Sequence, residues 1–147
     1  MMVGAYAVYF SLFVAAFLAA TILPAQSEAG LAGLVILGQY NVFWLITVAS
    51  VGNILGAVVN YAIGAGVASA RRPRWWPGTG QVGQRLTMFY HRYGAVTLLL
   101  SWVPIIGDPL TLLAGMMRLS FTLFLCLVSV AKITRYLVVV WLAVQFA

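Results

Sequence analysis

The stretch SWVPIIGDPL, from Ser101 to Leu110, places a carboxylate inside sequence that is otherwise almost continuously apolar. Asp108 is one of only two acidic residues in the chain, and it lies between two helix-breaking residues, Gly107 and Pro109. A charge in apolar surroundings is costly unless it is paired or solvated. The stretch therefore predicts a break in a buried helix, with a charged group held at the break for a structural or functional reason.

The composition around this stretch is that of an integral membrane protein. Hydrophobic residues make up 64% of the 147 residues, and charged residues only 7%. Soluble domains are about half apolar and about a quarter charged, so this chain has too little polar surface to solvate a globule of its size. The formal charge of +6 fits a cytoplasmic membrane face better than nucleic acid. We expect residues 1–147 to form a single membrane domain.

The apolar stretches differ in length. A membrane-spanning helix needs about 20 mostly apolar residues. Residues 42 to about 70 and residues 121–146 meet this requirement, and residues 3–23 have the length. Short apolar pieces around a Pro/Gly break suggest re-entrant hairpins, which are allowed at membrane depth only where protein or a water-filled cavity satisfies the backbone. Three pieces are of this short kind: residues 29–37, 95–103 and 110–117.

Two Pro-x-x-x-acid breaks indicate an internal repeat. The first, LPAQSEAG, contains Pro24 and Glu28, and the second contains Pro104 and Asp108 at an offset of 80 residues. At the same offset the two long spans coincide. A match this short can arise by chance, but both acids of the chain fall in the matching place. Paired interrupted segments in corresponding halves are typical of a transporter with its binding site at the membrane midplane.

The loop between the two halves carries most of the positive charge. Residues 71–93 hold five of the eight basic residues, and the positive-inside rule places them in the cytoplasm. Repeat 1, about 3–70, and repeat 2, about 94–147, would then have inverted topology. The residues expected at the membrane surface are Arg71, Arg72, Arg74, Trp75 and Trp76.

The end of this loop has the pattern of a short amphipathic helix. Its apolar residues recur at steps of four, three and four residues, whereas Arg85, His91 and Arg92 lie on other faces. This pattern fits a helix that lies along the membrane surface. The apolar positions are Val82, Leu86, Phe89 and Tyr93.

The last span carries two cations, Lys132 and Arg135, which share one helix face because they are three residues apart. A cation at the bilayer centre costs about 2.5 to 3.5 kcal/mol and is normally paired or faces a wet cavity. Only Glu28 and Asp108 can supply the counter-charge. We therefore predict one polar cluster at mid-membrane. The alternative is a set of salt bridges that merely fixes hairpin docking, although intramembrane ionisable residues more often mark substrate or proton paths.

Two further features of the predicted cluster concern the ligand. Helix N-termini beginning after each acid would present backbone N–H groups and positive dipole ends, which favour an anion. An acid beside such a site can be discharged by proton binding, which would couple transport to protons.

Small and polar residues on the first long span complete the prediction. Gly52 and Gly56 form a small-xxx-small face that permits close helix approach, and Gly64 continues the helix-packing positions. Asn53 and Asn60 lie on the same span. They either line the cavity or serve as hydrogen-bonding glue between helices.

An enzyme is not expected. The one histidine, His91, is far in sequence from Cys126 and from both acids, so a metal site or a nucleophile–base pair lacks parts. An aspartyl-protease dyad would need two acids that share a proton, whereas Glu28 and Asp108 each lie at a separate predicted break. We therefore expect no catalytic residue, no metal and no cofactor.

The run RYGAVTLLLSWVPIIGDPLTLLAGMMRLS, from Arg92 to Ser120, resembles the second conserved block of the DedA membrane proteins, the family of the SNARE-associated or VTT domain. The chain is most similar to the small YqaA-like branch of that family. Glu28 after Pro24 and the block VGNILGAVVNYAIG, residues 51–64, also match. The resemblance covers roughly residues 23–136.

The resemblance implies an all-α fold with two re-entrant hairpins in inverted repeat, each followed by a transmembrane helix. It also implies a bacterial inner-membrane location and a role in moving lipids, such as undecaprenyl phosphate or phospholipid, or in proton-motive-force homeostasis. The acid that is essential in the family corresponds to Glu28, and the position that is usually aspartate in the glycine-rich span is Asn53.

The chain departs from the family in its charges at the second break. Typical members carry arginines in a G-R-F-x-P-G-x-R pattern, where this chain has Ser101 and Gly107. Asp108 stands in the turn instead. Lys132 and Arg135 are therefore candidates for the missing positive charge.

Taken together, the residues and the resemblance predict a transporter that translocates a lipid or lipid phosphate, with proton coupling as an option. Its expected partners are membrane lipids, including anionic or polyprenyl-phosphate lipids, and protons, without nucleic acid; a homo-oligomer is left open. The alternatives are a proton-coupled transporter of a small solute or drug cation and a non-transporting membrane scaffold. The predicted substrate- and proton-binding residues are Glu28, Asp108, Lys132, Arg135 and Asn53. The predicted hairpin breaks are Pro24, Pro104, Gly107 and Pro109.

Overall fold

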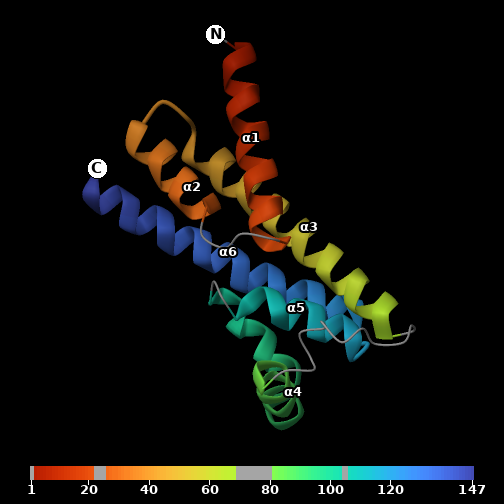
Figure 1. Ribbon diagram of the computed structural model, residues 1–147. Coiled ribbons are helices and arrows are strands. Elements are labelled where there is room, and N and C mark those ends of the chain that lie inside the picture. The colour runs from red at the N-terminus through yellow and green to blue at the C-terminus, as the bar shows by residue number, and fades with distance from the viewer. Residues whose placement is uncertain (1, 22–25, 69–80, 104–105) are drawn as a thin grey trace. The chain divides into compact units, whose positions relative to one another are not determined.

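A computed structural model describes residues 2–21, 26–68, 81–103 and 106–147. Every regular element in these ranges is a helix, so the predicted all-α fold class is confirmed for them (Figure 1). In chain order the elements are α1 (Met2–Thr21), α2 (Gln26–Leu37), α3 (Val42–Ala68), α4 (Gln81–Tyr93), the 3-10 helix η1 (Gly94–Trp102), α5 (Gly107–Met116) and α6 (Phe121–Phe146).

Three of these helices are long and apolar enough to cross a membrane. They cover Val3–Thr21, Val42–Gly66 and Phe121–Phe146, which correspond to the three long stretches expected from the sequence. The short apolar pieces form α2, η1 and α5, with 12, 9 and 10 residues. These lengths are below the roughly 20 residues that a spanning helix needs. Re-entrant insertion of the short helices stays a prediction.

The order of the helices repeats along the chain at the predicted offset. Adding 80 to the bounds of α2 gives 106–117, and α5 covers Gly107–Met116. Adding 80 to the bounds of α3 gives 122–148, and α6 covers Phe121–Phe146. The inverted orientation of the two halves stays a prediction.

Both acids lie in the first turn of a short helix. Glu28 is the third residue of α2, and Asp108 is the second residue of α5. The prediction that these helices begin after each acid is therefore wrong. The physical reason is the helix macrodipole, because a carboxylate in the first turn is stabilised by the positive helix N-terminus.

The helices form two compact units. The first comprises residues 1–56 and 132–147 and thus contains α1, α2, the first part of α3 and the end of α6. Helix α1 packs against α2 in this unit (Figure 1). Its core consists of Leu12, Ala16, Leu31, Val35, Leu45, Ala49, Tyr136, Val140 and Ala143.

Two glycines let α3 approach α1 closely within the first unit. A Cβ atom added at Gly52 would lie 2.6 Å from the carbonyl oxygen of Phe13, and one at Gly56 would lie 2.5 Å from the Cβ atom of Ala20. A residue with a side chain fits at neither position unless α1 moves away from α3. The contact has the close backbone approach that small-xxx-small faces permit between membrane helices.

The second unit comprises residues 57–131. It contains the end of α3, then α4, η1 and α5, and the start of α6, with η1 packed against both α4 and α5 (Figure 1). Its core consists of Ala57, Leu98, Leu110, Leu113, Ala114, Phe124 and Val128. Each unit therefore combines one short apolar α-helix with one part of α3 and one part of α6.

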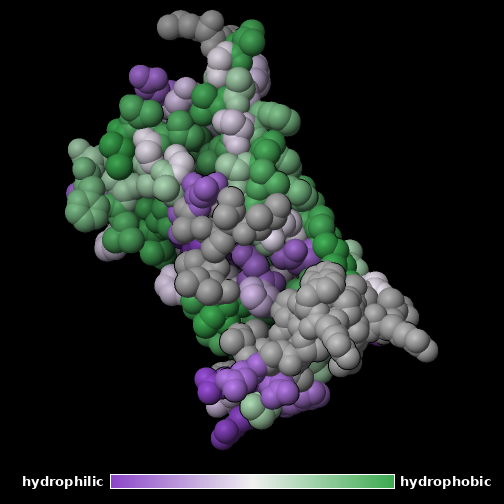
Figure 2. Space-filling model, in the orientation of Figure 1, coloured by the Kyte–Doolittle hydropathy of each residue, from purple (hydrophilic) through white to green (hydrophobic). Residues whose placement is uncertain are grey.

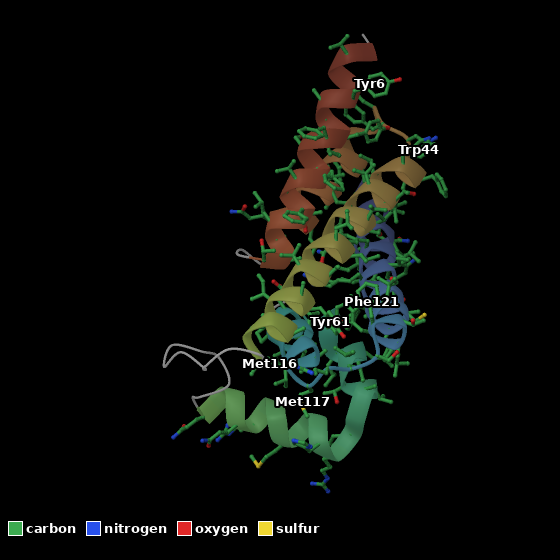
Figure 3. The ribbon with its side chains drawn as sticks, turned by 90° about the vertical axis from the view of Figure 1, so that its right-hand side faces the viewer. Tyr6, Trp44, Tyr61, Met116, Met117 and Phe121 are labelled. Carbon is green, nitrogen blue, oxygen red and sulfur yellow. The ribbon has the colours of Figure 1, made fainter. Side chains whose placement is uncertain are left out.

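A pair of glycines brings α3 and α5 together in the second unit. A Cβ atom at Gly64 would collide with the carbonyl oxygen of Leu112, and one at Gly115 would collide with the carbonyl oxygen of Tyr61. Both obstacles are backbone atoms, so rotating a side chain cannot relieve the collision. Beside this crossing the Tyr61 ring lies 5.6 Å from that of Phe121, in the region that Figure 3 labels.

Large apolar side chains cover the outside of the long helices. Tyr6 on α1 and Trp44 on α3 are mostly exposed and point away from their helices (Figure 3). Trp141 on α6 is also exposed. Figure 2 shows apolar surface along the long helices and hydrophilic surface at α4. Soluble monomers rarely expose large apolar patches, so the long helices present surfaces suited to lipid.

Candidate functional site

An ion pair joins two helices of the first unit. Nη2 of Arg135, on α6, lies against Oε1 of Glu28, in the first turn of α2. The two side chains are 9% and 20% exposed. The structure thus brings together one of the two predicted cations and one of the two predicted acids, largely out of contact with the surroundings.

A buried tyrosine lies next to this ion pair. Tyr136 follows Arg135 on α6 and is fully buried. Its hydroxyl group is 3.0 Å from Oγ of Ser27 on α2 and accepts a hydrogen bond of 2.7 Å from Nδ2 of Asn53 on α3. Because Ser27 precedes Glu28, one phenol group ties α2, α3 and α6 together at the ion pair.

Two buried polar atoms on α3 have no hydrogen-bond partner within the described ranges. They are Oδ1 of Asn53 and Oγ of Ser50. Asn53 is 3% exposed and Ser50 is 4% exposed. The two residues are three apart and share a helix face. Buried polar groups are nearly always satisfied by protein or by water, so these atoms are suited to hold a water molecule or a polar ligand group.

A second cation lies on the same face of α6. Lys132 precedes Arg135 by three residues and Tyr136 by four, and it is only 1% exposed. Lys132 is the residue at which the α6 part of the first unit begins. An ammonium group buried to this degree requires polar or charged partners.

Asp108 belongs to the second unit. It is half-buried in the first turn of α5, where its backbone carbonyl accepts a hydrogen bond of 2.7 Å from Oγ1 of Thr111. The same Oγ1 accepts a hydrogen bond of 3.3 Å from Nδ2 of Asn60 on α3. The convergence of Asp108 with Glu28 and the two cations stays a prediction.

The first unit therefore offers a carboxylate, a guanidinium group and hydroxyl groups in one place. Such a set can bind an anionic or polar group and can take up a proton at the carboxylate. Among the described residues, no group of three or more His, Cys, Asp and Glu side chains could hold a metal ion. The one cysteine, Cys126, is exposed on α6 in the second unit.

Comparison with known proteins identifies the family. Residues 23–145 match the family model of the VTT domain. The chain belongs to the VTT-domain, or DedA, family. The family predicted from the sequence is confirmed.

The similar proteins are bacterial. The chain is 41% identical over 139 residues to the inner membrane protein YqaA of Escherichia coli strain K12, covering 92% of this chain and 91% of that protein. The same identity and coverage hold for the inner membrane protein YqaA of Shigella flexneri. A protein of Haemophilus influenzae named as uncharacterized is 33% identical over 145 residues, covering 92% of this chain and 87% of that protein. No solved structure matches.

These relatives and the three apolar helices indicate a bacterial inner-membrane protein of the VTT-domain family. The cytoplasmic location of residues 71–93 stays a prediction. Several predicted residues lie outside the described ranges: Pro24, Pro104, Arg71, Arg72, Arg74, Trp75 and Trp76.

The remaining predicted break residues open α5 of this VTT domain. Gly107 begins the helix and Pro109 follows Asp108 in its first turn, where a proline costs no helical hydrogen bond. Gly107 is buried, and a Cβ atom there would collide with the backbone of Ser101. A side chain at this position would push η1 and α5 apart.

Helix α4 exposes polar side chains. All of its residues whose side chains the structure describes are exposed, and five of them are polar: Gln81, Gln84, Arg85, His91 and Arg92. Met88 and Tyr93 are the exposed apolar or aromatic ones. The side chains of Val82, Leu86 and Phe89, predicted to form the apolar face, are outside the described residues.

Sequence reasoning missed three residues of the site in the first unit. Tyr136 carries a detectable signal, because it lies four residues after Lys132 and shares its helix face. Ser27 and Ser50 carry a weaker signal, since a single serine in an apolar helix is common. Spacing relative to Asn53 places Ser50 on the same face of α3.

Proposed function

We propose that this VTT-domain protein moves a lipid or lipid phosphate across the inner membrane and that Glu28 binds a proton in the process. The observation that carries the proposal is the buried Glu28–Arg135 pair in a unit otherwise built from apolar helices. Buried pairs contribute little net stability, because the free energy of desolvation offsets the Coulomb attraction. Intramembrane charges are kept mainly where a function needs them.

The substrate class follows from the cations. A guanidinium group binds phosphate oxygens in a bidentate geometry, and Arg135 is the guanidinium at this site. In the proposed cycle a proton binds the Glu28 carboxylate, the ion pair breaks, and Arg135 then pairs with the phosphate of an anionic lipid headgroup. Loss of the proton restores the ion pair and releases the headgroup. Lys132 adds positive charge on the same face of α6.

The repeated helix order supports a transporter built from two related halves, which we propose to have inverted topology. Each unit combines one short helix, α2 or α5, with parts of both α3 and α6. In the proposal α2 and α5 are the membrane-embedded arms of two re-entrant hairpins, and residues 71–93 lie in the cytoplasm. Inverted repeats with broken helices are a recurrent architecture of membrane transporters.

Reconstitution into vesicles tests the proposal. Lipids with labelled headgroups, one anionic and one zwitterionic, are incorporated, and a membrane-impermeant quencher reports the labels that reach the outer leaflet. The expected result is faster exchange of the anionic lipid than in protein-free vesicles. Glu28→Gln should slow this exchange, whereas Gln26→Ala, an exposed position of the same helix turn, should leave it unchanged. No acceleration for any anionic lipid would count decisively against lipid translocation.

The proton-coupled solute transporter and the scaffold predict other outcomes. A solute transporter should bind a water-soluble ligand and show flux that does not depend on bilayer composition. A scaffold should keep its activity in cells when Glu28→Gln is combined with Lys132→Gln. The proposed lipid translocase should lose its activity in this double variant even when the variant is folded and present in the membrane.

A further inference from the structure

We propose that α4 and η1 form a separate binding site for one anionic phospholipid, with an acyl chain in a groove of η1 and the headgroup on arginines of α4. The site lies in the second unit. It does not depend on the proposed translocation, because it uses none of the charged residues of the first unit.

The groove is apolar and small. It has a volume of about 290 Å³ and is lined by Tyr93, Val96, Thr97, Leu99 and Leu100. This is near the lower end of the usual range of ligand pockets, about 300 to 1,000 Å³, so it suits part of one chain rather than a bulky ligand. The Thr97 hydroxyl donates a hydrogen bond to the Gly94 carbonyl and is therefore already satisfied.

Positive charge lies at the edge of this groove. The guanidinium carbon of Arg92 is 5.7 Å from the ring centroid of Tyr93, and that tyrosine also lines the groove. Arg85, two helical turns before Arg92, is exposed on α4 as well. Residues 81–107 contain no acid. An anionic headgroup at the groove edge thus meets Arg92, with the exposed Arg85 about 10 Å farther along α4, and no like charge from this segment.

The turn between α4 and η1 brings the basic part and the apolar part of the site together. Gly94 has a φ angle of +64°, a left-handed conformation that glycine adopts without strain. The chain therefore passes from the basic end of α4 into the apolar η1 within one residue. A phospholipid carries both complementary parts, a phosphate and a long apolar chain. An acidic peptide or a nucleic acid complements only the arginines.

Thermal unfolding of the full-length protein in neutral detergent tests the site. Phosphatidylglycerol should raise the midpoint further with each increase in its concentration, because a ligand that binds only the folded state stabilises it. Phosphatidylcholine with the same acyl chains should raise it much less. Arg92→Gln should weaken the apparent affinity for phosphatidylglycerol about fivefold, since one basic residue near an anionic lipid contributes about 1 kcal/mol.

Two further variants separate the headgroup from the chain. Leu100→Ser makes the groove polar without changing charge and should also weaken binding of phosphatidylglycerol. Arg118→Gln removes the same charge from an exposed position between α5 and α6 and should leave the affinity within about twofold of the parent. Arg92→Gln should translocate lipid at the parent rate in vesicles, if translocation is observed for the parent.

Other outcomes overturn the proposal. Equal shifts by both lipids, or equal losses for Arg118→Gln and Arg92→Gln, would indicate a general surface effect. An unchanged affinity of Leu100→Ser would show that the groove does not hold the chain. A change in oligomeric state of Leu100→Ser without any effect of phosphatidylglycerol would assign the groove to a second copy of this chain.

Discussion

The first turns of α2 and α5 occupy corresponding places in the repeat but are held by different interactions. In α2, Glu28 pairs with Arg135, and the preceding Ser27 contacts the hydroxyl group of Tyr136. In α5, Thr111 connects the backbone carbonyl of Asp108 to Asn60 through hydrogen bonds. The Glu28–Arg135 contact joins formal charges, whereas the hydrogen bonds of Thr111 join neutral groups.

The two kinds of contact differ in their energetic contribution. Hydrogen bonds between neutral side chains in membrane proteins contribute about 0.6 kcal/mol on average. A buried ion pair behaves differently, because removing one partner leaves an uncompensated charge. Substitutions in the Glu28–Arg135 pair should therefore have larger effects than substitutions in the hydrogen bonds of Thr111.

The largest effect is expected at the ion pair. Arg135→Met leaves the Glu28 carboxylate without its partner and should lower the free energy of unfolding by about 3 to 5 kcal/mol. Glu28→Gln combined with Arg135→Met removes both charges and should restore most of this loss. Chemical denaturation in mild detergent measures both values. A loss below about 1 kcal/mol for the single variant, typical of an exposed pair, would remove the contrast between the ion pair and the neutral hydrogen bonds.

An intermediate effect is expected at the glycine crossing of the second unit. Gly115→Ala forces a methyl group against the Tyr61 carbonyl and should destabilise by about 1 to 3 kcal/mol, as overpacked cores do. Gly66→Ala is the matched control, since nothing lies within 4 Å of a Cβ atom there. It should be neutral or stabilise by up to about 1 kcal/mol through helix propensity. Equal midpoints for the two variants would mean that α3 and α5 are farther apart than described.

The smallest effects should come from the neutral hydrogen bonds. Tyr136→Phe and Thr111→Val each remove two contacts of one hydroxyl group, and each should cost about 1 to 2 kcal/mol. Thermal midpoints of the two variants against the parent give the values. A loss of about 3 kcal/mol or more for either variant, as large as that expected for Arg135→Met, would contradict the ranking of the ion pair above the neutral hydrogen bonds.

Long helices were the most predictable part of the fold. The bounds of α6 were predicted because residues 121–146 form one apolar run, and the apolar piece 110–117 predicted most of α5. The start of α2 was misjudged, since Glu28 was taken as a break residue. The sequence alone does not show whether a carboxylate lies in the first turn of a helix or in the loop before it. The one guide is the helix dipole, which favours a carboxylate in the first turn.

The sequence does not predict which acid pairs with which cation in the site. Two acids and two cations allow several pairings, and only tertiary packing selects Glu28 with Arg135. The hydroxyl groups of Ser27 and Tyr136 are 109 residues apart in the chain and meet through the packing of α2 against α6. Periodicity identifies the face of one helix, but it does not identify the face of the neighbour that it contacts.

The most direct test is lipid translocation by the double variant Glu28→Gln, Arg135→Gln in vesicles. Both side chains stay polar and uncharged, and replacing a buried ion pair by neutral residues is often tolerated. The variant should therefore fold, which its thermal midpoint verifies. We predict that translocation of the anionic lipid falls about tenfold or more, because charge-assisted hydrogen bonds contribute about 1.5 to 3 kcal/mol. Translocation at the parent rate by the folded double variant would contradict the central role of this ion pair.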